Sequence, residues 1–202
     1  MAACRGIPSE PALEQSEGCA SLYGVIQYGQ KQLPNYHLRR ADMASSIQVT
    51  VKQTEPMTVA FIGMWGPYTQ IPEAFGKLYQ WIGQKGYVPS GPPLGLYLNA
   101  PGQIPEDQLL WELRSPIAGD VALSEPDEQG LGVKHLAAIQ VASTMHKGPF
   151  EKVEETYKAL AEWVVQNGYE MSGPPEEVYF SNPAETRPED LLTEIRFPVR
   201  KK

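Results

Sequence analysis

The pattern of hydrophobic and polar residues changes period along the chain in the order strand, helix, strand, strand. Residues 57–64 form an apolar run that predicts a strand. A helix is predicted next, because apolar residues recur with helical spacing at Ile71, Phe75, Leu78 and Ile82. Two more short strands are predicted at 94–98 and 109–115.

The same order returns with an offset of 82 residues. Strands are predicted at 136–145, 178–181 and 191–199, and a second helical stripe consists of Val153, Tyr157, Leu160 and Val164. The motif Ser-Gly-Pro-Pro occurs whole in both halves, at 90–93 and 172–175. Further matched pairs are Tyr68 with Phe150, Trp81 with Trp163, Gly86 with Gly168, Tyr97 with Tyr179, Glu112 with Glu194, and Arg114 with Arg196. The sequence therefore predicts an α+β fold built from two tandem strand–helix–strand–strand repeats.

These repeats set the predicted domain boundaries. The first repeat covers 46–118, a linker covers 119–131, and the second repeat covers 132–202, while residues 1–45 form a partly disordered extension. Each repeat has one helix for three strands, so one face of its sheet is left uncovered and free to line a groove.

Composition narrows the class of protein. Of the 202 residues, 42% are hydrophobic and 20% are charged, which is ordinary for a globular chain, and no apolar run approaches the ~18 residues of a membrane span. The net charge of −7 argues against nucleic acid as the main partner. The two cysteines, Cys4 and Cys19, cannot staple the fold or form a zinc site. We expect a cytoplasmic protein with no membrane partner.

Strand alternation suggests which side chains meet in the groove. If the aliphatic residues of each strand face the helix, Tyr97 and Tyr179 point to the open face, together with Glu177. The same alternation places Glu112 and Glu194 on the open face. Trp65 and Tyr68 stand at the exit of the first strand, whose Phe61 cannot be assigned a face because that strand is apolar on both. Trp111 falls on the core face, so a bulge or a twisted strand end is needed to bring it to the groove.

Aromatic rings beside carboxylates are typical of a binding site for a flat, apolar and cationic molecule. Structural alternatives stay open: each Glu-x-Arg pair is also typical of a solvated ion pair, and strand tyrosines commonly serve packing. Trp81 and Trp163 are expected in the core. The histidines, His37, His135 and His146, lack the spacing of metal ligands, and His146 is expected to be a surface or half-buried residue. No cofactor or metal is expected, and neither a phosphate-binding loop nor a nucleophile motif is present.

The repeated motifs, with the closing Glu194-Ile195-Arg196-Phe197-Pro198-Val199, resemble the GyrI-like small-molecule-binding family over about residues 46–202. This resemblance implies that the two units pack about a pseudo-twofold axis, with a curved antiparallel sheet lining a groove and the helices on the outer face. It places the ligand-facing acid at Glu194, with Tyr68, Tyr97 and Tyr179 as neighbouring aromatics. Members act as ligand-sensing parts of multidrug-responsive regulators, as a gyrase inhibitor, and as stand-alone proteins.

One stand-alone subgroup, the cyclopropanoid cyclopropyl hydrolases, detoxifies cyclopropane-bearing DNA alkylators, and the chain is similar to it in its groove aromatics, notably Trp65 and Trp111. By this resemblance Glu194, Glu112 and Tyr68 are candidate catalytic residues, while the ligand would contact Phe61, Trp65, Tyr97, Trp111, Glu177 and Tyr179. The sequence leaves three functions open: binding of hydrophobic or cationic xenobiotics, hydrolysis, and a protein-interaction or regulatory role. It leaves the oligomeric state open as well.

Overall fold

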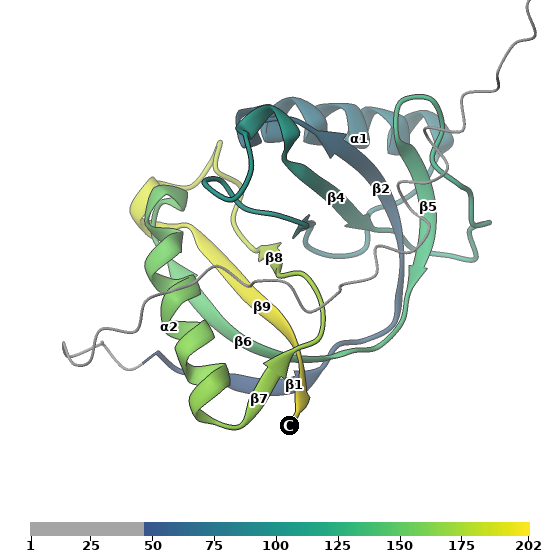
Figure 1. Cartoon of the computed structure of the whole chain (residues 1–202). Helices are drawn as coiled ribbons and strands as arrows, with labels where there is room; N and C mark the ends of the chain where they lie inside the picture. The colour runs from purple at the N-terminus through teal and green to yellow at the C-terminus, as the bar shows by residue number, and fades with distance from the viewer. Residues whose placement is uncertain (1–46) are drawn as a thin grey trace, which may run out of the picture. The chain divides into compact units, whose positions relative to one another are not determined.

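The computed structural model describes residues 47–202, all of which lie in one compact unit. Nine strands form a large curved antiparallel sheet, accompanied by two α-helices, so the fold is α+β (Figure 1). Predictions about the extension, Cys4, Cys19 and His37 concern residues outside the described part.

The predicted order of elements is present in both segments of the chain. In the first, strand β2 (Met57–Trp65) leads into helix α1 (Ile71–Lys85), followed by β3 (Leu94–Tyr97) and β4 (Leu110–Pro116). In the second, β6 (Gln140–Lys147) leads into α2 (Val153–Gln166), and β8 (Glu176–Tyr179) and β9 (Leu192–Lys201) follow.

Three strands were not predicted: β1 (Thr50–Gln53), β5 (Leu131–Leu136) and β7 (Tyr169–Met171). The single strand predicted at 136–145 is wrong, because β5 ends at Leu136 and β6 begins at Gln140. The chain bends between them. These strands depend on distant partners, since β1 pairs with β6 and β5 pairs with β2. Together, β1–β2 and β5–β6 run side by side as one long curved ribbon (Figure 1).

The strand order is β1-β6-β9-β8-β3-β4-β2-β5, with β7 paired to β9. Helix α1 packs on β2 and β4, and α2 packs on β6, β7 and β9. The central strands β3 and β8 therefore lie between the strands that the helices cover. We call the side that carries both helices the helix face, and the other side the helix-free face.

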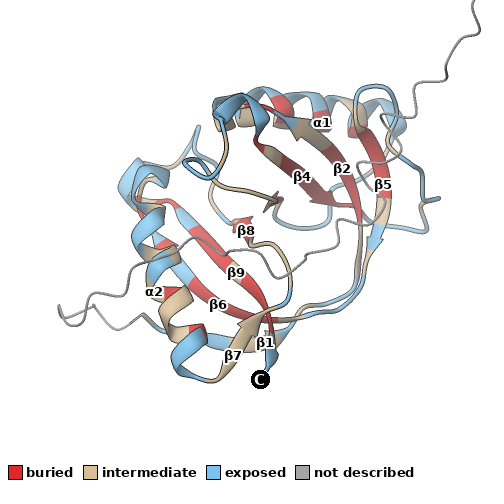
Figure 2. Cartoon of the chain, viewed as in Figure 1, coloured by how far each residue is buried: buried red, intermediate tan, exposed pale blue. Residues whose placement is uncertain are grey.

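Each helix buries its apolar stripe in its own core cluster. Ala74, Leu78 and Ile82 of α1 pack on β2 and β4, and Leu160 and Val164 of α2 pack on β6 and β9. Burial of one such leucine contributes roughly 1.5–3 kcal/mol. The buried residues concentrate on the strands and the inner sides of the helices (Figure 2).

Gly86 ends α1 in the left-handed conformation, with φ of 71°, as its position after the stripe predicts. Trp81 and Trp163, expected in the core, are half-buried and pack against the edges of the two core clusters. Within residues 47–202, neither helix has the length and hydropathy that crossing a membrane would need.

Candidate functional site

The pairing of the two central strands decides which side chains meet at the middle of the sheet. Gly95 lies opposite Glu177 across β3 and β8, and it lies opposite Leu113 across β3 and β4. Leu113 belongs to the core under α1, and Ile195, the β9 partner of Glu177, belongs to the core under α2. Paired residues share a face of the sheet, so Glu177 lies on the helix face.

By the same register, Tyr97 and Tyr179 lie on the helix face. The prediction that these tyrosines and Glu177 point to the open face is therefore wrong. Alternation separates a strand into two sets of residues but does not say which set faces the helices. Because the helices cover the outer strands, the helix face at β3 and β8 accommodates polar aromatic residues rather than aliphatic ones.

Four tyrosines surround the buried Glu177 carboxylate, and we call these five residues the Glu177 cluster. Tyr157 of α2 donates a hydrogen bond of 2.8 Å from its hydroxyl to Oε1 of Glu177. The hydroxyls of Tyr97 and Tyr179 hydrogen-bond to each other, and Tyr179 also hydrogen-bonds to Glu177. Tyr68 completes the cluster, with its ring centroid 5.0 Å from that of Tyr97 in an edge-on contact.

Further aromatic rings extend the Glu177 cluster toward both helices. Phe75 of α1 and Phe150, just before α2, each place their ring centroid 6.0 Å from that of Tyr179, in edge-on geometry. The indole of Trp111 contacts Tyr68 at 6.2 Å, and its Nε1 donates 2.8 Å to the carbonyl of Gly66. Trp111 is buried on the helix face, as alternation predicts, and it reaches the cluster through Tyr68 without a bulge.

The electrostatics of the Glu177 cluster favour neutral phenols around one carboxyl group. Burial raises the pKa of Glu177, although hydrogen bonds from Tyr157 and Tyr179 oppose the rise. Burial, together with the charge of Glu177, also raises the pKa values of Tyr68, Tyr97 and Tyr179. Among residues 47–202, no lysine or arginine forms an ion pair with Glu177. The cluster can therefore offer a carboxylate, phenolic donors and aromatic ring faces to a ligand.

Gly95 and Tyr157 are members of this region that sequence reasoning missed. A Cβ on Gly95 would lie 2.7 Å from the hydroxyl oxygen of Tyr179 and 2.9 Å from that of Tyr97. Only glycine leaves space for this pair of hydroxyls. The 82-residue offset aligns Gly95 with Glu177, which could have marked the position. Tyr157 was recognised only as part of an apolar stripe, where its hydroxyl gave no signal of a role.

The helix-free face holds a second group of acids, and these are paired with cations. Glu112 accepts 2.5 Å from Nε of Arg114 and 2.6 Å from Nζ of Lys134. Arg114 also donates 2.8 Å from Nη1 to Glu176. Both acids and both cations of this network lie on strands, so the sheet register fixes their geometry.

Glu194 has a similar arrangement on β9. It accepts 2.5 Å from Nζ of Lys52, and 2.9 Å from Nε and 2.7 Å from Nη2 of Arg196. Burial opposes its ionisation, but hydrogen bonds from Lys52 and Ser143 and the charge of Arg196 outweigh that effect and lower its pKa. The Glu-x-Arg pairs are thus ion pairs, but the carboxylates are buried rather than solvated, since Glu112 is 4% exposed and Glu194 is 5% exposed.

Placing Glu112 and Glu194 in one hollow with Tyr68, Tyr97 and Tyr179 is therefore wrong, because the acids and the tyrosines lie on opposite faces. Two further predicted site residues lie away from the Glu177 cluster. Phe61 is buried on the helix-free face, where the ammonium of Lys134 lies 4.4 Å from its ring centroid. Trp65, at the end of β2, is 65% exposed.

His146 has structural surroundings. It is buried, not at the surface or half-buried as expected, because it links β6 to the first turns of α2. Its Nδ1 lies 2.8 Å from the Thr156 hydroxyl, and its Nε2 lies 3.2 Å from the Pro149 carbonyl. Within residues 47–202, His, Cys, Asp and Glu side chains form no group of three or more that could hold a metal.

Comparison with known families agrees with this architecture. The model of the GyrI-like small molecule binding domain matches residues 47–200. The chain belongs to this family. Among curated proteins, none matches the chain.

Solved GyrI-like structures share the fold. The C-terminal domain of EcmrR superposes with a TM-score of 0.63 at 23% identity, covering 77% of this chain and 99% of that domain. EcmrR in its complex with DNA gives 0.67 at 21% identity over 78% of this chain, which spans only 59% of that protein. A hydrolase from Listeria innocua gives 0.56 at 16% identity, covering 78% of this chain and 94% of its own.

Proposed function

We propose that the protein binds planar, hydrophobic cations at the Glu177 cluster. The observation that carries this proposal is a buried carboxylate that lacks a cationic partner among residues 47–202 and is surrounded by phenol rings. Burying a charge without a partner is costly, so a positively charged ligand would supply the missing countercharge. Membership of a small-molecule binding family supports the same assignment.

The surrounding rings favour a flat ligand. Tyr68 packs edge-on against Tyr97, and Tyr179 packs edge-on against Phe75, and an aromatic face attracts a cation by about 0.5–2 kcal/mol. Phe75 and Phe150 would add apolar walls on either side of Tyr179. Specific ligands, including the xenobiotics and drugs suggested by the family resemblance, would be selected by this combination of rings and one charge.

Fluorescence titration with two dyes of opposite charge tests the proposal. Rhodamine 6G, a planar cation, is expected to bind, and anionic fluorescein is not. Glu177→Gln should weaken rhodamine 6G binding roughly tenfold to hundredfold, the range for losing one charged partner. Glu189→Gln, an exposed acid, is the matched control and should leave binding unchanged. Equal binding of rhodamine 6G to wild type and Glu177→Gln would refute the proposal.

A hydrolytic function at the same cluster is the second candidate, favoured by the contact of Glu177 with Tyr157 beside the Tyr97–Tyr179 pair. Glu177 would take a proton from water while the oxygen bonds to a carbon of a strained cyclopropane. The ring C–C bond would break, and its electron pair would pass to the conjugated carbonyl. That oxygen becomes a phenolate and takes a proton from a tyrosine, which recovers one from Glu177.

Mass spectrometry separates binding from hydrolysis. After long incubation with a cyclopropane-bearing alkylator, hydrolysis predicts a product that has gained one water, and this product should be lost in Glu177→Gln. Recovery of unchanged alkylator at high protein concentration would leave binding alone. In either case Glu177 takes over the carboxylate role first expected for Glu194 and Glu112, which are engaged in ion pairs on the other face.

The finer architecture and the cellular setting are also proposals. The shared element order and the central β3–β8 pairing support two tandem repeats related by a pseudo-twofold axis between those strands. The boundaries at 46–118 and 132–202 remain the expected repeats. The net charge of −7 supports a protein without a nucleic-acid partner of its own, and a cytoplasmic location remains the expected setting. A regulatory role through a protein partner would predict its capture in a ligand-dependent complex.

A further inference from the structure

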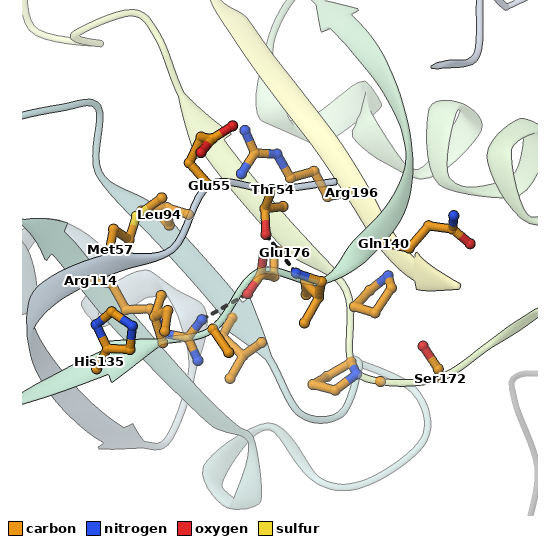
Figure 3. A pocket seen from close by; sticks show the side chains of 17 residues that line it. Thr54, Glu55, Met57, Leu94, Arg114, His135, Gln140, Ser172, Glu176 and Arg196 are labelled. Atoms are coloured by element: carbon orange, nitrogen blue, oxygen red, sulfur yellow. Dashed lines mark hydrogen bonds and ion pairs between the residues drawn. The ribbon is translucent and has the colours of Figure 1, made fainter. Parts of the chain in front are cut away.

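The helix-free face contains a hollow of about 490 Å³ that the Glu177 cluster does not share. Its floor is formed by β3, β4, β8 and β9, and its walls are formed by the bends of the long ribbon at residues 54–57 and 135–140 (Figure 3). Much of the lining is apolar and includes Met57, Leu94, Leu96, Pro174 and Pro198. This volume is in the range of small-molecule sites in proteins.

Two arginines reach this hollow, but their charges are balanced differently. Arg114 lies between two carboxylates, those of Glu112 and Glu176, and Lys134 pairs with Glu112. The charges of these four side chains sum to zero. At the other end Arg196 and Lys52 share a single carboxylate, that of Glu194. This end of the network therefore carries one surplus positive charge, shared by Arg196 and Lys52, and of these two side chains Arg196 is the one that lines the hollow.

Arg196 is also available for a ligand. Its Nε and Nη2 donate to Glu194, and a guanidinium has five N–H donors in total, so the pair leaves donors for a second acceptor. Glu194 fixes the orientation of the guanidinium plane, and the side chain is 13% exposed, in the lining of the hollow. If these ion pairs served stability alone, apolar side chains of similar size would stabilise the region at least as well, and no charged group would need to border an open space.

We propose that this hollow is a second small-molecule site, which takes a compact apolar molecule with one carboxylate and holds that group at Arg196. A carboxylate fits because a guanidinium presents parallel donors that match its two oxygens. One acid competes for this position. Glu55 is exposed at the same end of the hollow and forms no ion pair among the described residues (Figure 3). It therefore weakens the local positive field without neutralising Arg196 by contact.

Isothermal titration calorimetry with three matched probes tests this site: 1-naphthoate, its neutral amide and 1-naphthylmethylammonium. We expect naphthoate to bind at least tenfold more tightly than the amide. In Glu177→Gln, where the cluster no longer offers a carboxylate, we expect the ammonium compound to bind no better than the amide. Arg196→Met should reduce naphthoate binding to the level of the amide. Glu55→Gln should strengthen it about twofold to threefold, because a repulsive charge at the rim is removed.

Two further variants make the test decisive. Arg196→Met leaves Glu194 paired with Lys52, and thermal melting reports whether the variant folds. If it does not fold, Met57→Trp keeps every charge and fills the hollow, and it must abolish naphthoate binding. Glu177→Gln must leave naphthoate binding unchanged, which separates this site from the Glu177 cluster. Equal affinity for naphthoate and amide, or full affinity in folded Arg196→Met or Met57→Trp, would overturn the proposal.

Discussion

The two faces of the sheet provide different partners for buried acids. On the helix-free face, Glu112, Glu176 and Glu194 each pair with at least one arginine, and lysines add to two of these pairs. On the helix face, Glu177 is equally buried but is hydrogen-bonded to phenols. Glu176 and Glu177 are adjacent in sequence, so strand alternation alone sends one to each environment.

This difference indicates which acid is available for a ligand. An acid paired with a well-oriented arginine has its charge neutralised, and removing the arginine leaves a buried charge. An acid that is hydrogen-bonded to neutral phenols has no countercharge when it is ionised. The free-energy cost of burying that charge appears as its raised pKa. The helix-free acids therefore have their charges satisfied within the protein, and Glu177 remains available to a cation.

The largest expected effect comes from breaking the paired network. Arg114→Met should lower the free energy of unfolding by about 3–5 kcal/mol, because Glu112 and Glu176 both lose their arginine. Urea denaturation measures this loss. Arg200→Met, which removes an exposed pair with Glu170, should cost less than about 1 kcal/mol. Similar losses in both variants would mean that the buried network contributes no more than a surface pair.

A smaller effect is expected when the tyrosine pair is displaced. Gly95→Ala should weaken binding of rhodamine 6G by roughly 1–3 kcal/mol, since the new methyl group would overlap the hydroxyls of Tyr97 and Tyr179. Gly76→Ala, in α1, has open space around the new Cβ and serves as the control. Anisotropy titrations of both variants give the comparison. Unaltered affinity in Gly95→Ala would show that the hydroxyl pair does not shape the site.

The pH dependence of binding should distinguish Glu177 from the paired acids. Its pKa is raised, so the carboxylate becomes protonated at a higher pH than an ordinary glutamate, and cation affinity is lost as the pH falls through that raised value. Below it, affinity should fall about tenfold per pH unit. If Glu194 held the cation instead, its lowered pKa would move the loss of affinity below the pH range in which an ordinary glutamate becomes protonated. A loss confined to that lower range would point to the helix-free face instead.

The smallest effect is predicted for Tyr157→Phe. The hydrogen bond from Tyr157 lowers the pKa of Glu177, so removing it should raise that pKa further. At high pH, binding of rhodamine 6G should weaken by no more than about 1 kcal/mol, but the midpoint of its pH dependence should move upward. Tyr87→Phe, which lies beside Trp81 and away from the cluster, is the control. A midpoint that does not move would exclude Tyr157 as a partner of the carboxylate.

Much of the fold could be predicted from local patterns. The helical stripes starting at Ile71 and Val153 locate both helices, and Gly86 ends the first where its position suggests. In contrast, β1 and β5 are stabilised by partners from the other half of the chain, and no local period shows such pairing. The site was predicted in part. Alternation placed Glu177 and Tyr179 on the same face of the sheet. Which of the two faces they occupy depends on how far the helices extend over the sheet.

The most direct test compares Glu177→Gln with Glu194→Gln in one experiment that measures rhodamine 6G affinity and the melting temperature together. We predict that Glu177→Gln loses affinity and melts no lower than wild type, because a buried unpaired charge has been removed. Glu194→Gln should retain affinity and melt lower, because Lys52 and Arg196 lose their shared acid. The reverse pattern, with affinity lost in Glu194→Gln and kept in Glu177→Gln, would contradict the account.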